Sequence, residues 1–464
     1  MPVTRLPGGT KMETRTFHKG SAMVICVIFV AVFAALAVGL AAISGANVQI
    51  ADNQKEANRA FANAESGLDV LKYWLNRVTI PSSTPTSQYL STTVSAIQND
   101  LQDTGVSNLA VTNDGFIPPV TLNSVTGQTF SGRISADAGN PGLFELRICG
   151  TCGNAARTIQ VQFSIEPYRF PIFNYGIATK GALRFPQNPT LTGAASNWEA
   201  DIYVESANDI TALQVGGNTN FDGDIDIANP LAAVDFQGDV QIAGDTGQAA
   251  IDNHVEVGAD PVDFPVPETV RFAPYATGGP IDPNSTSAPG VTLVNAVIPA
   301  GMDPTFTGNV TIQGILYVEQ PNVVTFTRNV QLQGLIVASG DAHNPGTNAI
   351  NFQGNFSSGP YPPDSQFDPL RNEQGSSIVA PGFGLSFTGN FASVNGVMAA
   401  SSMYFSANAS ALVKGTMISY SANPTWVEGN ISLNFDRADA VEIPAGFDLL
   451  RVLTYDRTSY AMVF

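Results

Sequence analysis

The sequence contains few cysteines, few histidines and few charged residues. Three cysteines and three histidines among 464 residues exclude a scaffold held by many disulfides and leave little material for a metal site built from histidine. Charged residues make up only 13% of the chain, and 39 acidic residues against 21 basic ones give a net charge of -18. An acidic surface repels DNA and anionic lipid, so nucleic acid is not expected as a partner.

Hydrophobic residues are plentiful by contrast. They make up 44% of the chain, beside 43 glycines and 30 prolines, which is too apolar for a disordered tail. The length suggests several domains. Little Lys and Glu together with much Thr, Asn, Gly and Val is typical of a β-rich protein outside the cytoplasm.

The N-terminal region begins with a short basic segment. Its first twenty residues hold four basic side chains against the single acidic Glu13. Ala22 to Ile43 then carries no charge, and at about 1.5 Å per residue this run spans the roughly 30 Å hydrocarbon core of a membrane. The sequence therefore predicts a transmembrane helix with its basic end in the cytoplasm.

The helical pattern continues beyond the apolar run. Apolar residues recur at steps of three, four and seven, which places them on one face of a helix. They are Ile50, Ala57, Phe61, Ala64, Leu68, Leu71 and Leu75. We therefore expect one helix over residues 21–78, half in the membrane and half amphipathic outside it, which Thr79-Ile80-Pro81 ends.

A basic leader ending in glycine, an apolar helix directly after it and an amphipathic continuation resemble the N-terminal region of type IV prepilins. Two segments carry the resemblance, Lys19-Gly20-Ser21-Ala22 and Ala60-Phe61-Ala62-Asn63-Ala64-Glu65-Ser66-Gly67-Leu68. They are similar in content and spacing to the G-x-A-L and A-F-x-x-A-E-x-G-L signatures of PilX-like minor pilins. The resemblance covers about the first 75 residues.

This resemblance implies a leader over residues 1–20, which a prepilin peptidase removes between Gly20 and Ser21. The mature subunit would then leave the inner membrane and pack against other pilin or pseudopilin subunits. The residues assigned to filament packing are Ile25, Ile50, Phe61, Ala64, Glu65, Leu68 and Leu71. Ile25 departs from the major pilins, which carry Glu at this fifth mature position, and the departure is typical of minor subunits that initiate or cap a fibre. The alternative is an uncleaved anchor with a helical stalk.

Residues 79–167 predict a small, strand-rich, pilin-like head. Alternating runs at Leu143–Ile148 and Thr158–Ile165 predict a hairpin, and Thr93–Gln102 predicts a short helix. Cys149 and Cys152 form one C-x-x-C in the connection. A zinc site would need a second pair of ligands, so we interpret the two cysteines as a local disulfide, with two free thiols as the alternative.

Beyond Pro167 a motif of the form aromatic-x-Gly-x-apolar-x-apolar recurs. Its copies begin at Phe221, Phe236, Phe306, Phe326, Phe352 and Phe387. Phe306 and Phe326 are 20 residues apart, a length suited to one coil of a β-solenoid with Val, Ile and Leu inside and ladders of Asn at the corners. Residues 168–464 are therefore predicted to form a β-solenoid, with a β-sandwich as the alternative and a hairpin over Leu449–Phe464 as a cap.

One segment of this region is similar to a calcium loop, with Gly223 at its sixth position. Its alternating oxygen-bearing side chains are Asn218, Asn220, Asp222, Asp224 and Asp226. Asn218 stands where such loops carry Asp, and Asn229 where a bidentate acid is needed. We interpret the segment as a solvated strand face, with calcium binding as the alternative.

Motifs for catalysis are missing. No G-x-S-x-G, H-E-x-x-H or P-loop pattern occurs, and His254 and His343 are isolated in the sequence, so no enzymatic activity is expected. We expect a structural minor subunit of a type IV pilus or pseudopilus, which contributes to filament initiation or to its tip and contacts a surface or polysaccharide. One helix would anchor it, with the bulk of the chain outside the cytoplasm. The alternatives are a membrane-anchored solenoid enzyme acting on carbohydrate and a static cell-surface scaffold.

Overall fold

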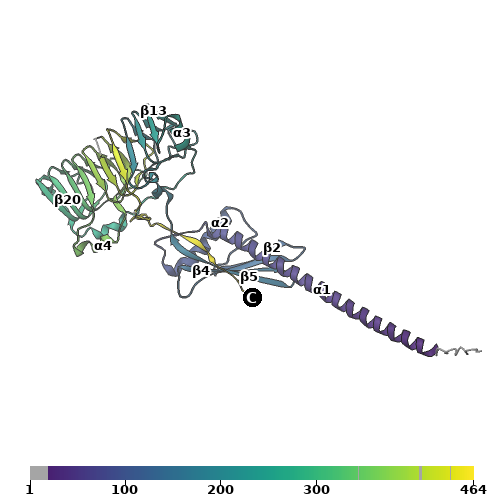
Figure 1. Cartoon of the computed structure of the whole chain (residues 1–464). Coiled ribbons are helices and arrows are strands. Elements are labelled where there is room, and N and C mark those ends of the chain that lie inside the picture. The colour runs from purple at the N-terminus through teal and green to yellow at the C-terminus, as the bar shows by residue number, and fades with distance from the viewer. Residues whose placement is uncertain (1–18, 343, 407–409, 439, 464) are drawn as a thin grey trace, which may run out of the picture. The chain divides into compact units, whose positions relative to one another are not determined.

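The computed structural model describes residues 19–342, 344–406, 410–438 and 440–463, so residues 1–18 of the expected leader lie outside it. The chain divides into two compact units (Figure 1). Unit 1 comprises residues 1–78, 86–165 and 453–464, and unit 2 comprises residues 79–85 and 166–452. The larger part of unit 2, residues 166–452, therefore lies in the sequence between two segments of unit 1.

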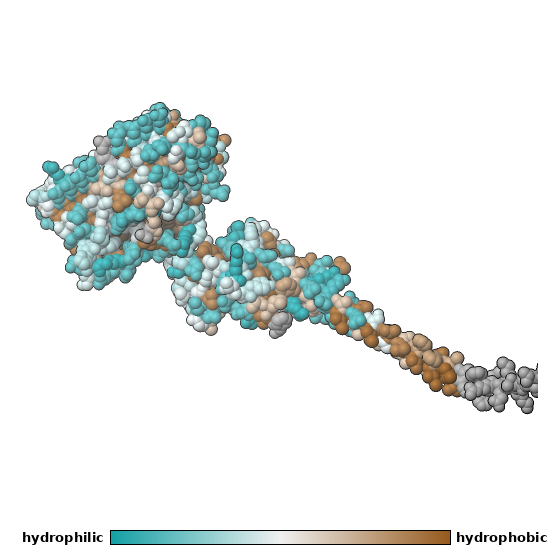
Figure 2. Space-filling model, in the orientation of Figure 1, coloured by the Kyte–Doolittle hydropathy of each residue, from teal (hydrophilic) through white to brown (hydrophobic). Residues whose placement is uncertain are grey.

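Unit 1 begins with the long helix α1 (Lys19–Leu75). Its 57 residues give a length of about 85 Å at 1.5 Å per residue. Every residue from Met23 to Ile50 is exposed, and Figure 2 shows this stretch as a hydrophobic rod. Within the described residues, α1 is the one helix long and apolar enough to cross a membrane. The predicted long helix is confirmed, and it ends at Leu75 rather than at residue 78.

The C-terminal half of α1 packs on an antiparallel sheet, which it contacts at β3 and β4. The six strands of this sheet are β1 (Thr79–Pro81), β2 (Phe116–Asn123), β3 (Gln128–Ala136), β4 (Leu143–Cys152), β5 (Ala155–Pro167) and β32 (Leu450–Val463), in the spatial order β1-β32-β5-β4-β3-β2. Alternate residues of β4 and β5 are buried, as one covered face of a sheet requires. Both the predicted hairpin and a helix at the predicted place, α2 (Tyr89–Asp103), are present.

The C-terminal segment differs from the expected hairpin and cap. β32 is a single strand of 14 residues. Its first three residues pair with β1 (Thr79–Pro81), and its remainder lies beside β5, where the N–H of Gln162 donates to Oγ of Ser459 over 2.7 Å. A continuous strand satisfies the free backbone groups along the edge of β5, which a hairpin folded on itself would leave open.

Unit 2 is built from short strands that pair in parallel. The described strands form one 26-stranded sheet, which winds so that each strand pairs with strands of the circuits before and after it. We call each circuit a coil. β20 (Asn309–Val318) pairs residue by residue with β22 (Val330–Ala338), Val310 opposite Val330. One coil is therefore 20 residues long here, as the spacing of Phe306 and Phe326 predicts.

The strands of unit 2 form two series. The first series consists of β6 (Ile177–Thr179), β7 (Leu183–Phe185), β8 (Thr190–Gly193), β9 (Ile202–Val204), β10 (Thr211–Val215), β11 (Thr219–Phe221), β12 (Ile225–Ile227), β13 (Ala233–Phe236) and β14 (Val240–Ile242). The second series begins with β18 (Gly290–Ile298) and β19 (Thr305–Phe306) and continues, after β20, with β21 (Val323–Phe326), β22, β23 (Ala349–Phe352), β24 (Phe356–Gly359), β25 (Ser376–Phe387), β26 (Phe391–Val394), β27 (Val397–Phe405), β28 (Ser410–Val413), β29 (Met417–Ser419), β30 (Thr425–Val427) and β31 (Ser432–Phe435). Between the series lie β15 (Asp245–Thr246), α3 (Gln248–His254), β16 (Val255–Val257) and β17 (Gly279–Pro280).

The coils do not stack in chain order. The first series starts in the middle of the stack and runs to the end where β16 pairs with β12. The chain then crosses to the opposite end, from which the second series winds back. The second series ends in the middle of the stack, where β29, β30 and β31 pair with β6, β7 and β8. We call this junction the seam, because it joins the last coil of the chain to the first.

The interior of the stack is a single apolar column. Five phenylalanines stack at its centre, and they are Phe306, Phe326, Phe352, Phe387 and Phe405. Consecutive rings lie 5.0, 5.3, 4.8 and 5.1 Å apart and tilt by no more than 12°. Parallel pairing in register places equivalent residues about 4.8 Å apart, which forces the rings to stack. At one turn between strands, the N–H of Asn355 donates to Oδ1 of Asn329 over 3.2 Å, a contact of the kind that the predicted Asn ladders require.

One outer face of the stack is apolar as well, and other segments of unit 2 cover it. On β20 and β22, Ile315 and Leu335 are fully buried. They belong to a cluster with Phe272, from the segment that crosses the stack, and Leu370 of α4 (Asp368–Arg371). The crossing segment therefore closes a face that a plain coil would leave open to water.

Candidate functional site

The predicted processing residues lie at the start of α1. Gly20 and Ser21 belong to its first turn, directly after the part of the leader that lies outside the described residues. Cleavage between them therefore stays a prediction.

The residues assigned to filament packing fall into two groups. Ile25 and Ile50 are 53% and 62% exposed, so both are free to contact lipid or another helix. Glu65 is exposed and Phe61 is half-buried. Within the part of the chain that the structure describes, the N-terminal half of α1 is thus the part of the helix that no other element covers.

The other group corrects the expectation. Ala64 and Leu71 are fully buried and Leu68 is 6% exposed, because this face of α1 packs on the sheet of its own unit. These three side chains are therefore not available for contacts between subunits. The helical periodicity identifies the apolar face correctly, but it does not say which surface covers that face.

At residues 60–68, helix α1 and strand β4 approach each other closely. A Cβ on Gly150 of β4 would lie 2.1 Å from the carbonyl oxygen of Ala60 and 2.3 Å from the backbone nitrogen of Ala64. Nδ2 of Asn63 donates to the carbonyl oxygen of Thr151 over 2.7 Å. Small residues on both elements therefore let the two backbones meet, and an amide side chain fixes their register.

The predicted disulfide does not form. Cys149 and Cys152 are free thiols, and both lie on β4. Residues three apart on a strand point to opposite faces and are about 10 Å apart, beyond the reach of a disulfide. The strands continue to Cys152 and from Ala155, which pair with each other, so the predicted connection between residues 148 and 158 was too long and the two cysteines lie on the strand. The alternative of two free thiols is the one that the structure supports.

The calcium-like segment is extended. Its residues follow β11, the turn at Gly223 and β12, and both strands pair in parallel with their neighbours. Alternate residues of a strand lie about 6.6 Å apart, so their side chains are spread along a line and do not surround one point. Asp222 accepts from the N–H of Gly193 and Asp226 from the hydroxyl of Tyr175. Among the described residues, no group of three or more His, Cys, Asp or Glu could hold a metal ion.

His254 is not isolated, which corrects the sequence reading; His343 lies outside the described residues. Nδ1 of His254 is 2.7 Å from Oδ1 of Asp224, and its Nε2 is 3.3 Å from Oδ2 of Asp245. The bond to Asp224 is the main reason why the pKa of His254 is raised. Both ring nitrogens are thereby engaged, and the histidine ties the end of α3 to the coil of β12.

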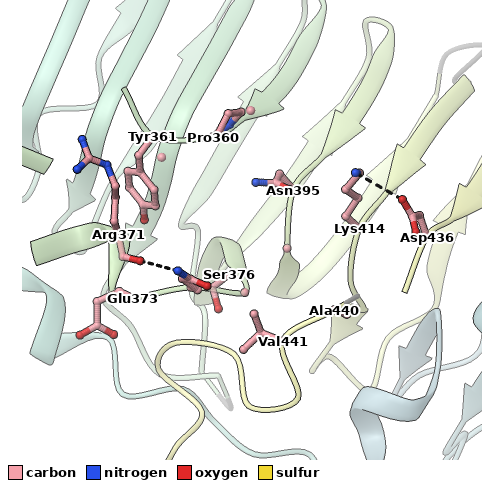
Figure 3. A pocket seen from close by; sticks show the side chains of 15 residues that line it. Pro360, Tyr361, Arg371, Glu373, Ser376, Asn395, Lys414, Asp436, Ala440 and Val441 are labelled. Atoms are coloured by element: carbon pink, nitrogen blue, oxygen red, sulfur yellow. Dashed lines mark hydrogen bonds and ion pairs between the residues drawn. The ribbon is translucent and has the colours of Figure 1, made fainter. Parts of the chain in front are cut away.

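A cavity of about 450 Å³ opens on unit 2 (Figure 3). One wall comes from the edges of successive coils and the other from two segments that lie over them. The coil residues are Gly334, Gly359, Ser376, Asn395, Gly396, Lys414 and Asp436, and the overlying residues are Pro360, Tyr361, Arg371, Glu373, Gln374, Gly375, Ala440 and Val441. A glycine stands where the two walls approach, since a Cβ on Gly375 would lie 2.7 Å from Cβ of Val441.

The charged groups of the cavity are compensated by neighbours. Nζ of Lys414 lies 3.4 Å from Oδ2 of Asp436. Glu373 accepts from Arg271 over 2.7 Å and from the hydroxyl of Tyr275 over 3.0 Å, and it points away from the cavity in Figure 3. Lys414, Asp436 and Glu373 therefore already have partners of opposite charge within the protein.

Tyr361 is the cavity residue with an unused polar group. Its hydroxyl is buried and has no hydrogen-bond partner among the described residues, and burial raises its pKa. In Figure 3 its ring points down between the two walls. A ligand hydroxyl or a water in the cavity would satisfy this group.

Sequence reasoning missed the cavity. One of its two overlying segments comes from the insertion between Phe352 and Phe387, where the repeat spacing grows from 20 to 35 residues; the other, at Ala440 and Val441, comes from the C-terminal part of unit 2. That irregular spacing was a signal for an insertion, but it carried no information about where the inserted segment would lie.

No protein-family model matches this sequence, and no curated protein matches it. Among solved structures, the chain is similar to that described as "Crystal structure of competence-associated pilin ComZ from Thermus thermophilus". The two are 15% identical, the match covers 88% of this chain and 98% of that one, and the TM-score is 0.20.

Proposed function

We propose that this chain is a PilX-like minor subunit of a type IV pilus or pseudopilus. The observation that carries the proposal is the division of α1 into two halves. Ala60, Ala64 and Leu71 are fully buried against the subunit's own sheet, whereas Met23 and Phe29 are 72% and 59% exposed. An apolar surface of this length must be covered by lipid or by equivalent helices.

In this proposal α1 has two successive environments. It anchors the precursor in the inner membrane, and after removal of the leader by a prepilin peptidase it packs against the helices of other pilin subunits. Ile25 places no carboxylate in the apolar half, so no partner for a buried charge is required. This favours a position at the start or the tip of the filament.

Unit 2 is, in this proposal, a β-solenoid outside the cytoplasm that contacts a surface. Parallel pairing in register, one interior column and a 20-residue coil support a solenoid over a sandwich, in which two antiparallel sheets would face each other. Its role is binding and not catalysis. The compensated charges around the cavity, Lys414 with Asp436 and Glu373 with Arg271, support this view.

Substitution of the residue before the cleavage site tests the proposal. We expect wild-type protein from sheared surface fractions to begin at Ser21 by mass spectrometry. Gly20→Arg should begin at Met1 or Pro2, remain in membranes and be absent from filaments, because a bulky cation replaces the small residue at the processing point. Gly9→Arg adds the same charge earlier in the leader and should be processed normally.

Two results would contradict the proposal. If filaments contained Gly20→Arg at the wild-type level, removal of the leader would not be required for assembly. A wild-type chain that keeps its leader and occurs only in membranes would support the alternative of a static, anchored scaffold.

A further inference from the structure

A row of outward-facing residues crosses the seam of unit 2. Its members are Tyr404 of β27, Trp426 of β30, Arg184 of β7, Gln214 of β10 and Asp235 of β13. Strand register pairs each of them with the next in this order. Parallel strands lie about 4.8 Å apart, so the row extends over roughly 19 Å. We call it the outer row.

Two aromatic residues form one end of the outer row. Trp426 is 40% exposed although its neighbours Thr425 and Val427 are buried. Tyr404 is half-buried, and its hydroxyl donates to Oε2 of Glu428 over 2.8 Å, which fixes the ring on the surface. The row therefore presents a rigid aromatic platform that the packing of the stack does not require.

The same line of the sheet is small and polar away from the seam. Beyond Tyr404, the residues in register are Ser386, Asn351, Thr325 and Thr305. A solvated strand face needs nothing larger than these side chains. The aromatic residues and the arginine are thus confined to the middle of the stack, where the two series of coils meet.

The other end of the outer row offers hydrogen-bonding groups. Nε2 of Gln214 donates to Oδ2 of Asp235 over 3.0 Å. Nη1 of Arg184 donates to the carbonyl oxygens of Leu183 and Ala212, and the nearby carboxylates of Asp209 and Asp235 favour its charged form. One cation therefore stands among several carboxylates, Glu428 included, in a chain of net charge -18. An anionic chain would be repelled from this surface, whereas a neutral chain with hydroxyl groups would be accepted.

We propose that the outer row binds a neutral polysaccharide that runs along the axis of the stack. A pyranose ring would place its C–H face on the indole of Trp426, and hydroxyls of following sugars would bond to Arg184, Gln214 and Asp235. An open row, unlike a closed pocket, lets a long chain continue past both ends. The inference deepens the surface-contact part of the proposed function and rests on that part alone.

Binding of the purified full-length chain in detergent to immobilised polysaccharides tests the inference. The neutral probes are β-glucan, mannan and xylan, and the anionic probes are polygalacturonate and alginate. We expect binding to at least one neutral probe and weaker binding to both anionic ones. Trp426→Ala should raise the Kd at least about tenfold, as loss of a central aromatic contact does, and Gln214→Ala should raise it less.

Trp198→Ala is the matched control. Trp198 is 48% exposed on the same unit but lies outside the outer row, so its loss should leave binding unchanged. Circular dichroism of each variant checks that it folds. The inference fails if no neutral probe binds, if an anionic probe binds best, or if both tryptophan variants lose binding equally. Because filament assembly plays no part in this measurement, failure of the pilin proposal would be seen separately, in the processing experiment.

Discussion

At the scale of single residues, Asp201 is a partly buried carboxyl group whose negative charge destabilises unit 2. Burial raises the pKa of Asp201 to about 6 from 3.8, although the N–H of Asp224 donates to its Oδ1 over 2.8 Å. The nearby carboxylates of Asp224 and Asp226 raise it further. Because the folded state holds the proton more tightly than the unfolded chain, this group lowers stability as the pH rises from about 4 to about 6.

We therefore expect Asp201→Asn to stabilise unit 2 at neutral pH. The amide keeps the acceptor for Asp224 and removes the poorly solvated charge, so the free energy of unfolding should rise on the order of 2 kcal/mol at pH 7. At pH 4 the gain should largely disappear, because the folded carboxyl is already protonated. Urea denaturation at both pH values measures the effect. The exposed Asp239→Asn serves as control, and an equal gain in this variant would contradict the explanation.

At the scale of elements, the contact between α1 and its sheet depends on missing side chains. A Cβ on Gly67 would lie 2.7 Å from Cδ2 of Phe130 and 2.9 Å from Cγ2 of Ile148, both of which are buried. Gly67→Ala should therefore destabilise unit 1 by about 1–3 kcal/mol, even though alanine favours a helix by roughly 1 kcal/mol over glycine. Thermal unfolding of the full-length chain in detergent measures the loss.

Gly45→Ala provides the matched comparison on the same helix. A Cβ at Gly45 would meet no atom within 4 Å, so only the gain in helix propensity remains and the stability should not fall. If Gly67→Ala and Gly45→Ala changed the stability equally, the close contact of α1 with Phe130 and Ile148 would not explain why glycine stands at position 67.

Local elements were predictable from the sequence, and their partners were not. The long uncharged run and the helical periodicity predicted α1, and the alternation of apolar and polar residues predicted the β4–β5 hairpin. Both signals lie within a few consecutive residues. The pairing of β32 with β5 joins Ser459 to Gln162, and nothing near either residue signals the other. For the same reason the motif around Ala64 was assigned to the filament, when the surface that covers it is β4 of its own unit.

At the scale of the whole molecule, the order in which the coils are wound decides which residues meet. Phe306 and Phe326 revealed the length of a coil, but a repeat alone implies that coils stack in chain order. In the fold, Trp426 lies opposite Arg184, 242 residues away in the sequence. The outer row exists only because the last coil returns to the first, so no local pattern could have predicted it.

The seam should couple the two series of coils. Leu433 of β31 lies opposite Leu191 of β8, and both are buried; Glu199 also accepts from the N–H of Arg437 across the same junction. In a stack where each coil contacts only its neighbours, damage spreads from the site of a substitution. Leu433→Ser should therefore lower hydrogen-exchange protection in residues 177–193 as well as in residues 410–435.

Leu332→Ser tests whether the effect belongs to the seam. Leu332 is equally buried but lies on β22, several coils away, so its loss should reduce protection in β20 to β24 and leave residues 177–193 close to wild type. If Leu433→Ser lowered protection only in residues 410–435, the first series would be stable without its neighbour, and each series would fold as a separate stack. If both variants lost protection throughout unit 2, the coils would unfold as one cooperative body, because the continuous apolar column would outweigh the contacts between individual neighbours.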